Sequence, residues 1–150
     1  MRAILLVMLY SIFLSGCASQ ISTSNKLVTT IYNEQSDILV ANFQEAVRPM
    51  DNYTIESSDN NILYVEYDPA NIMMGSAKVK VEFREVDGMT KAGERVNGIE
   101  VVYTDITSFF SQDTTFSGAD IIDRINQSFV DLASYKEIEH FTVKKLDNIK

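Results

Sequence analysis

The stretch KVKVEFREV, residues 78–86, constrains the fold of this chain more than any other segment. Along an extended strand Val79, Val81 and Phe83 point to one side, and the charged residues between them point to the other. A strand with one apolar and one charged side belongs to an antiparallel sheet that has one face packed and the other face in water. The rest of the chain must therefore supply apolar elements that cover a single face of this sheet.

Three other segments are typical of strands. YTIE (53–56) and ILYVEY (62–67) flank the turn-type cluster SSDNN and predict a hairpin. GIEVVYTDITSFF (98–110) predicts a further strand, and the pairs Asp87-Gly88 and Asn97-Gly98 predict turns around the polar loop that precedes it. Together with residues 78–86, these segments predict a meandering sheet of about four strands.

Two amphipathic helices are predicted, one before and one after these strands in the sequence. The first begins at Ser36, whose hydroxyl can cap it, and ends before Pro49. The preceding segment 27–33 (LVTTIYN) fits a strand because it is rich in β-branched residues, although one long helix from Ser24 fits the same apolar spacing. The second helix follows a capping-box pattern at 117–120. Its apolar stripe contains Ile121, Ile122, Ile125, Phe129, Leu132 and Ala133.

These elements predict an α+β fold, in which an antiparallel sheet of about four strands carries two helices on one face as a two-layer sandwich. Residues 27–150 form a single domain in this interpretation, and the C-terminal tail adds a short strand or a helical turn. The composition, 45% hydrophobic and 23% charged, is ordinary for a globular protein. The chain has one cysteine, Cys17, so no intrachain disulfide supports the fold.

The first sixteen residues have the pattern of a secretory signal peptide. Arg2 is followed by a mainly apolar run from Ala3 to Leu14, which as a helix covers roughly 18 Å of a hydrocarbon core about 30 Å thick. The exit sequence, Leu-Ser-Gly-Cys17, resembles the lipobox of bacterial lipoproteins. That resemblance implies cleavage before Cys17 and a diacylglyceryl group on its sulfur. The alternative is an ordinary signal peptide cut after Ala18 or Ser19, which releases a soluble secreted protein.

The resemblance implies a location in the bacterial cell envelope. Residues 17–26 become a lipidated tether, and the membrane is the first expected partner, reached through the lipid on Cys17. Two or three acyl chains anchor a protein stably, whereas one chain does so only marginally. Ala18 in the second mature position favours the outer membrane of a Gram-negative host, and a Gram-positive host would place the anchor in its plasma membrane.

Charge argues against nucleic acid as a partner. The chain carries 13 basic and 21 acidic residues, and removal of Arg2 with the signal peptide takes the net charge from −8 to −9. Nucleic-acid binding depends on lysine and arginine neutralising phosphates.

No catalytic, cofactor or metal motif is expected. His140 is the only histidine, so a histidine-dependent nucleophilic site would depend on it alone, and one histidine without a free thiol argues against zinc. Carboxylates are plentiful, but a glycosidase pair is defined by its separation in space. The simplest role for five of them is to solvate the open face of the sheet: Glu82, Glu85, Asp87, Glu94 and Glu100.

Residues 38–67 also resemble, by pattern alone, small uncharacterised bacterial lipoprotein domains with a TBP-like helix-on-sheet fold. This resemblance implies no activity. Met73 and Met74 lie after a proline turn and suit either an adaptable partner contact or packing under the sheet edge. The sequence as a whole favours a non-enzymatic envelope lipoprotein that binds a protein partner as an accessory or assembly factor. The alternatives are an envelope carboxylate-dependent hydrolase, a glycan-binding lipoprotein, and a structural protein with no fixed partner.

Overall fold

A computed structural model describes residues 28–69, 76–107 and 118–146. In chain order the elements are β1 (Val28–Tyr32), α2 (Ser36–Val47), β2 (Tyr53–Asp59), β3 (Ile62–Tyr67), β4 (Ala77–Met89), β5 (Arg95–Asp105), α3 (Gly118–Tyr135) and β6 (His140–Lys145). The expected α+β class is confirmed, with an antiparallel sheet and two helices. The signal peptide, Cys17, the tether and the pair Met73 and Met74 lie outside the described residues.

The sheet has six strands in the order β2-β3-β4-β5-β1-β6, so the expectation of about four strands was too low. The two added strands are the segments at the ends of the described chain. Their mutual register runs from Val28 opposite Lys144 to Tyr32 opposite His140. A segment of this kind is stable only when it finds its partner across the fold, and sequence spacing does not reveal that pairing.

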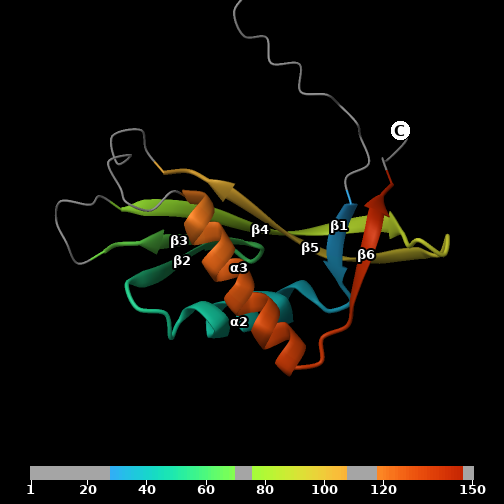
Figure 1. Cartoon of the computed structure of the whole chain (residues 1–150), viewed down its shortest axis with the longest axis horizontal. Helices are drawn as coiled ribbons and strands as arrows, with labels where there is room; N and C mark the ends of the chain where they lie inside the picture. Colours follow the sequence, from blue (N-terminus) through green and yellow to red (C-terminus); the bar gives the residue numbers. More distant parts are fainter. Residues whose placement is uncertain (1–27, 70–75, 108–117, 147–150) are drawn as a thin grey trace, which may run out of the picture.

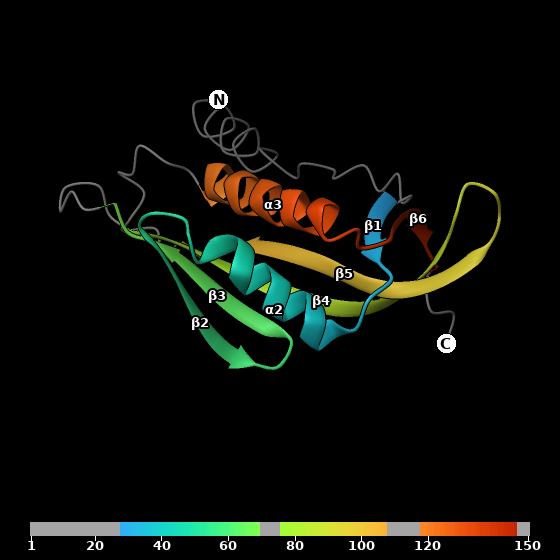
Figure 2. The ribbon, with the colours of Figure 1, turned by 90° about the horizontal axis from the view of Figure 1, so that it is seen from below.

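Both helices cover the same face of the sheet (Figure 2), which confirms the two-layer arrangement. Phe43 of α2 and Phe129 of α3 are fully buried and their rings lie 5.5 Å apart. The two helices are also joined by a hydrogen bond of 2.8 Å from the Ser128 hydroxyl to the Ala46 carbonyl. The sheet contributes alternate residues to this core, namely Leu63, Val65, Val79, Val81 and Phe83. The alternation in KVKVEFREV therefore orients β4 as expected.

The segment before Ser36 is a strand and not the start of a longer helix. The expected cap at Ser36 is wrong. Gln35 occupies the N-cap position without a side-chain hydrogen bond, and the Ser36 hydroxyl instead donates to Oδ1 of Asn61 at 2.6 Å. The helix ends at Val47, ahead of Pro49 as predicted.

Four strand boundaries differ from the sequence expectation, and one of them is the end of β5, which lies at Asp105 and not at residue 110. β2 continues through most of SSDNN to Asp59, so the hairpin turns at Asn60 and Asn61. β4 and β5 extend through both glycine pairs that were expected to form turns, and the reversal lies instead between Met89 and Arg95. The capping residue Ser117 and positions 108–110 lie outside the described residues.

Gly88 and Gly98 serve close approach between strands, which explains why they sit within strands. A Cβ at Gly88 would lie 2.3 Å from Cγ2 of Val143, and one at Gly98 would lie 2.6 Å from the backbone oxygen of Tyr32. At Gly88 the long β4–β5 hairpin reaches β6, where Gly88 pairs with Lys145 and Met89 with Lys144. Since β4 also pairs with β5, β5 with β1 and β1 with β6, these four strands close into a ring at one end of the sheet. Figure 1 shows that β1 and β6 cross the β4–β5 hairpin at a steep angle.

The ring encloses a small second core on the side of the sheet away from the helices. Ile31 and Val143 are fully buried there, and neither belongs to the cluster under the helices. Glu100 is also buried, with 8% of its surface exposed, so the expectation that it solvates an open face is wrong. Its Oε1 accepts a hydrogen bond of 2.6 Å from the Thr29 hydroxyl, and its Oε2 forms an ion pair with Nζ of Lys145 at 2.5 Å.

Candidate functional site

The face of the sheet opposite the helices is the broadest candidate surface among the described residues. The strand registers place eleven side chains on it, here called the open face. These are Thr54, Glu56, Ile62, Tyr64, Glu66, Lys78, Lys80, Glu82, Arg84, Val102 and Thr104. Because side chains alternate along each strand, every residue here has a neighbour on the helix-covered face. The open face thus follows directly from the pattern that orients the core.

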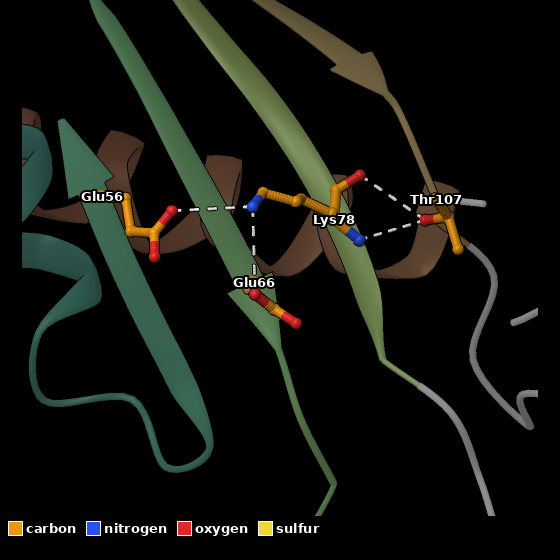
Figure 3. Close-up of polar contacts among 4 residues, drawn as sticks. All are labelled: Glu56, Glu66, Lys78 and Thr107. Carbon is orange, nitrogen blue, oxygen red and sulfur yellow. Dashed lines mark hydrogen bonds and ion pairs between the residues drawn. The ribbon is translucent and has the colours of Figure 1, made fainter. Parts of the chain in front are cut away.

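Lys78 links the open-face residues of three strands (Figure 3). Its Nζ lies 3.6 Å from Oε2 of Glu56 on β2 and 4.0 Å from Oε2 of Glu66 on β3. The same ammonium lies 5.6 Å from the ring centroid of Tyr64. Glu56 remains 71% exposed, so each of these pairs adds only about 0–1 kcal/mol to stability. One lysine shared by two carboxylates leaves this part of the surface with a net negative charge.

Glu82 forms a second charged group further along β4. Its carboxylate lies 3.1 Å from Nζ of Lys80 and accepts a hydrogen bond of 2.6 Å from Arg84. Hydrogen bonding to Lys80 and then to Arg84 holds the pKa of Glu82 below its usual value, against the opposing effect of partial burial. A lowered pKa means that this charge stabilises the fold at neutral pH and that the contribution is lost as the pH falls through that pKa.

Thr107, which follows β5, is hydrogen-bonded to the start of β4 on the side away from β3. The backbone N–H of Lys78 donates to the Thr107 hydroxyl at 3.1 Å, and the hydroxyl lies 3.5 Å from the Lys78 carbonyl (Figure 3). The Thr107 amide is in turn held by Oδ1 of Asp105 at 2.9 Å. These contacts hold the backbone from which the Lys78 side chain extends towards Glu56.

β2 forms one edge of the sheet, and no strand among the described residues pairs with its outer side. The Asn52 carbonyl accepts a hydrogen bond of 2.9 Å from the Asp68 N–H. Antiparallel pairs alternate between bonded and non-bonded positions, so Thr54 and Glu56 bond to β3. The N–H and C=O groups of Ile55 and Ser57 consequently point outward. Sequence reasoning placed this hairpin correctly but did not single out its edge.

An open cleft of about 910 Å³ lies beside the ring, between the loop after β1 and the β4–β5 hairpin. Glu34, Glu85 and Asp87 line it, together with the amides of Asn33, Gln35 and Asn97. Lys145, the partner of Glu100, also lines it. Two of the five carboxylates singled out in the sequence, Glu85 and Asp87, thus come together here, whereas Glu82, Glu94 and Glu100 do not line this cleft.

A smaller cleft of about 430 Å³ lies between α3 and the strands β1, β5 and β6. His140 lines it as an exposed residue at the start of β6, with its ring centroid 6.1 Å from that of Tyr32. Tyr103 contributes to the wall, and burial strongly raises the pKa of its hydroxyl.

Within residues 28–69, 76–107 and 118–146, no group of three or more His, Cys, Asp or Glu side chains is arranged to hold a metal ion. Neither described helix has the length and apolar character needed to cross a membrane. The chain matches no protein-family model, and no curated protein or solved structure shows significant similarity to it.

Proposed function

We propose that this protein is a lipid-anchored lipoprotein of the bacterial cell envelope that acts without catalysis, by binding a protein partner as an accessory or assembly factor. The open face is the observation that carries the binding role. It presents charged, aromatic and aliphatic side chains on a regular surface, while the helices cover the other face of the sheet. Partner surfaces of this kind combine apolar contact with complementary charge.

The residue inventory supports binding over catalysis. The chain has one histidine and no tryptophan, and its one cysteine is the expected lipid attachment site. Nucleophilic catalysis usually needs a histidine or a similar base within hydrogen-bond reach of the nucleophile. The Leu-Ser-Gly-Cys17 sequence supports the anchor, and Ala18 favours the outer membrane in a Gram-negative host.

Replacing Cys17 with serine tests the anchor. We expect Cys17→Ser protein to stay uncleaved or to leave the lipidated membrane fraction, because only a thiol can form the thioether to the lipid. The measurement is fractionation combined with the mass of the N-terminal peptide. Ser15→Ala is the matched control, since a small residue in the lipobox preserves processing. Mature, membrane-bound Cys17→Ser protein would contradict the anchor.

Photo-crosslinking from the open face tests the partner. A crosslinking amino acid at Thr104, which is exposed on β5, is expected to capture one protein in stoichiometric yield from native membranes. The same amino acid at Asp123, exposed on α3, is the control and is expected to capture none. Equal capture from both positions, or none from Thr104, would contradict binding through the open face.

Glycan binding or carboxylate-dependent hydrolysis is a second candidate, favoured by the acid-lined cleft. Glycosidases use two carboxylates across the scissile bond, and amide side chains suit sugar hydroxyls. If the protein is a hydrolase, Glu85→Gln combined with Asp87→Asn will lower its rate of hydrolysis of purified cell-wall glycan by about 100-fold or more. If it only binds glycan, the same double variant will no longer be retained by that glycan. Glu94→Gln, in the hairpin turn outside the cleft lining, is the control. An unchanged double variant removes this candidate.

A further inference from the structure

We propose that the outer edge of β2 accepts an extended strand from a partner protein, and that this strand carries lysine or arginine beside Glu56. The inference rests on the proposed protein-binding function and names the mode of recognition. In strand addition, backbone hydrogen bonds join the partner to the sheet, and alternate side chains provide specificity.

The backbone of β2 has the geometry that strand addition requires. Thr54 and Glu56 already bond to β3, so the N–H and C=O groups of Ile55 and Ser57 face outward and set the register of an added strand. A bulge between Ser57 and Asp59 breaks the regular pairing at one end. The regular part of β2 is therefore Tyr53–Ser57. The Tyr53 N–H already donates to the Met50 carbonyl at 3.4 Å, so Ile55 and Ser57 supply the outward-facing groups of this edge.

The two edge strands of the sheet, β2 and β6, differ in how far they are covered by other strands. At the β6 end, pairing of Gly88 and Met89 with Lys145 and Lys144 closes the ring and removes part of that edge. At the β2 end no described strand closes the sheet. Exposed edges are commonly protected by lysine or proline, and β2 contains neither between Tyr53 and Asp59. The open edge thus carries no lysine or proline at Ile55 or Ser57, the two residues whose backbone groups face outward.

Charge determines which partner fits this edge. On the open face Lys78 belongs to β4, while Glu66 of β3 and Glu56 of β2 are negative. Residues 51–59 include Asp51, Glu56 and Asp59 and no basic residue. A strand placed outside β2 lies next to the 71% exposed Glu56 carboxylate, so a cation on that strand gains a cross-strand pair of opposite charge. On the other face, half-buried Ile55 calls for an apolar neighbour.

The test uses a synthetic probe with this pattern, acetyl-TKVKVKT-amide, and the full chain purified from membranes in detergent. Residue-resolved amide hydrogen exchange is measured with and without the peptide. When the peptide saturates the protein, we expect the Ile55 and Ser57 amides to exchange at about one tenth of their free rate or below. A paired amide exchanges only when the pairing opens. The amides of Thr54 and Glu56, already bonded to β3, are expected to change little.

Charge reversal provides the matched pair of variants. Glu56→Lys is expected to weaken peptide binding about tenfold at low salt, and less at high salt where charges are screened. Glu94→Lys, the same change in the turn of the β4–β5 hairpin, is expected to leave binding within about twofold. The peptide acetyl-TEVEVET-amide is expected to bind more weakly than the lysine peptide.

Three results overturn the proposal. They are unchanged exchange at Ile55 and Ser57, equal peptide affinity of Glu56→Lys and the parent protein, and protection without peptide that rises with protein concentration. The last result would assign the edge to a second copy of the chain. Loss of the peptide effect while Thr104 still captures its partner overturns the edge assignment alone. Peptide protection without any Thr104 capture supports the edge assignment and contradicts binding through the open face.

Discussion

Phe129→Ala is expected to lower the free energy of unfolding by about 3–5 kcal/mol, the range for removing a large aromatic side chain from a packed core. Phe129 is fully buried, and its ring centroid lies 5.3 Å from that of Tyr32 and 5.5 Å from that of Phe43. The ring therefore joins α3, α2 and β1 at one point. Truncation leaves a cavity that three elements would have to move to fill. Denaturant unfolding followed by circular dichroism measures the loss.

Tyr135→Ala is the control for this substitution, because Tyr135 belongs to the same helix and is 84% exposed. Its removal is expected to change stability by less than about 0.5 kcal/mol. A Phe129→Ala protein that unfolds at the same denaturant concentration as Tyr135→Ala would show that α3 does not pack on the sheet as described.

Gly88→Ala is expected to cost about 1–3 kcal/mol of stability and to weaken the pairing between β4 and β6. The added Cβ would lie 2.3 Å from Cγ2 and 2.6 Å from Cβ of Val143. Val143 is buried in a strand and β-branched, so it has little freedom to turn away. Unfolding measurements give the stability, and amide exchange at Lys144 and Lys145 reports the pairing.

A double-mutant cycle separates this collision from a backbone effect. Val143→Ala removes both Cγ methyl groups and keeps Cβ, so it relieves the closest contact but not the 2.6 Å one, and the Gly88→Ala cost is expected to shrink by about 1 kcal/mol in that background. Gly93→Ala is the matched control. Gly93 has φ of 84° and nothing within 4 Å of an added Cβ, so its cost is conformational and independent of residue 143. Additivity in the Gly88 cycle would contradict the ring closure.

Local patterns predicted the elements whose neighbours in sequence are also neighbours in space. The alternation in 78–86, the 53–67 hairpin and the apolar stripe of α3 each follow from a repeat within one segment. The ring was missed because it joins β1 to β6 across the chain. Glycine pairs at Gly88 and Gly98 were interpreted as turns, since a glycine used for close approach looks the same in sequence as one used for a turn.

The candidate surfaces likewise divide into features that a local pattern predicts and features that depend on contacts between distant segments. The alternating lysines of β4 predicted a charged open face, and Lys78 is found there. Glu100 follows the same alternation, but the ring covers it and pairs it with Lys145. The cleft with Glu85 and Asp87 exists because the hairpin lies against the loop after β1. Such contacts depend on where distant segments meet, which no local repeat encodes.

The position of β1 has a mechanical consequence. β1 lies between β5 and β6 and is hydrogen-bonded to both, antiparallel in each case. Antiparallel bonds run perpendicular to the strand, so a pull along β1 from the chain that precedes Val28 loads the bonds to both neighbouring strands in shear. If that preceding chain is tied to a membrane, tension on the domain enters through a strand held on both sides and not through one that can be unzipped bond by bond.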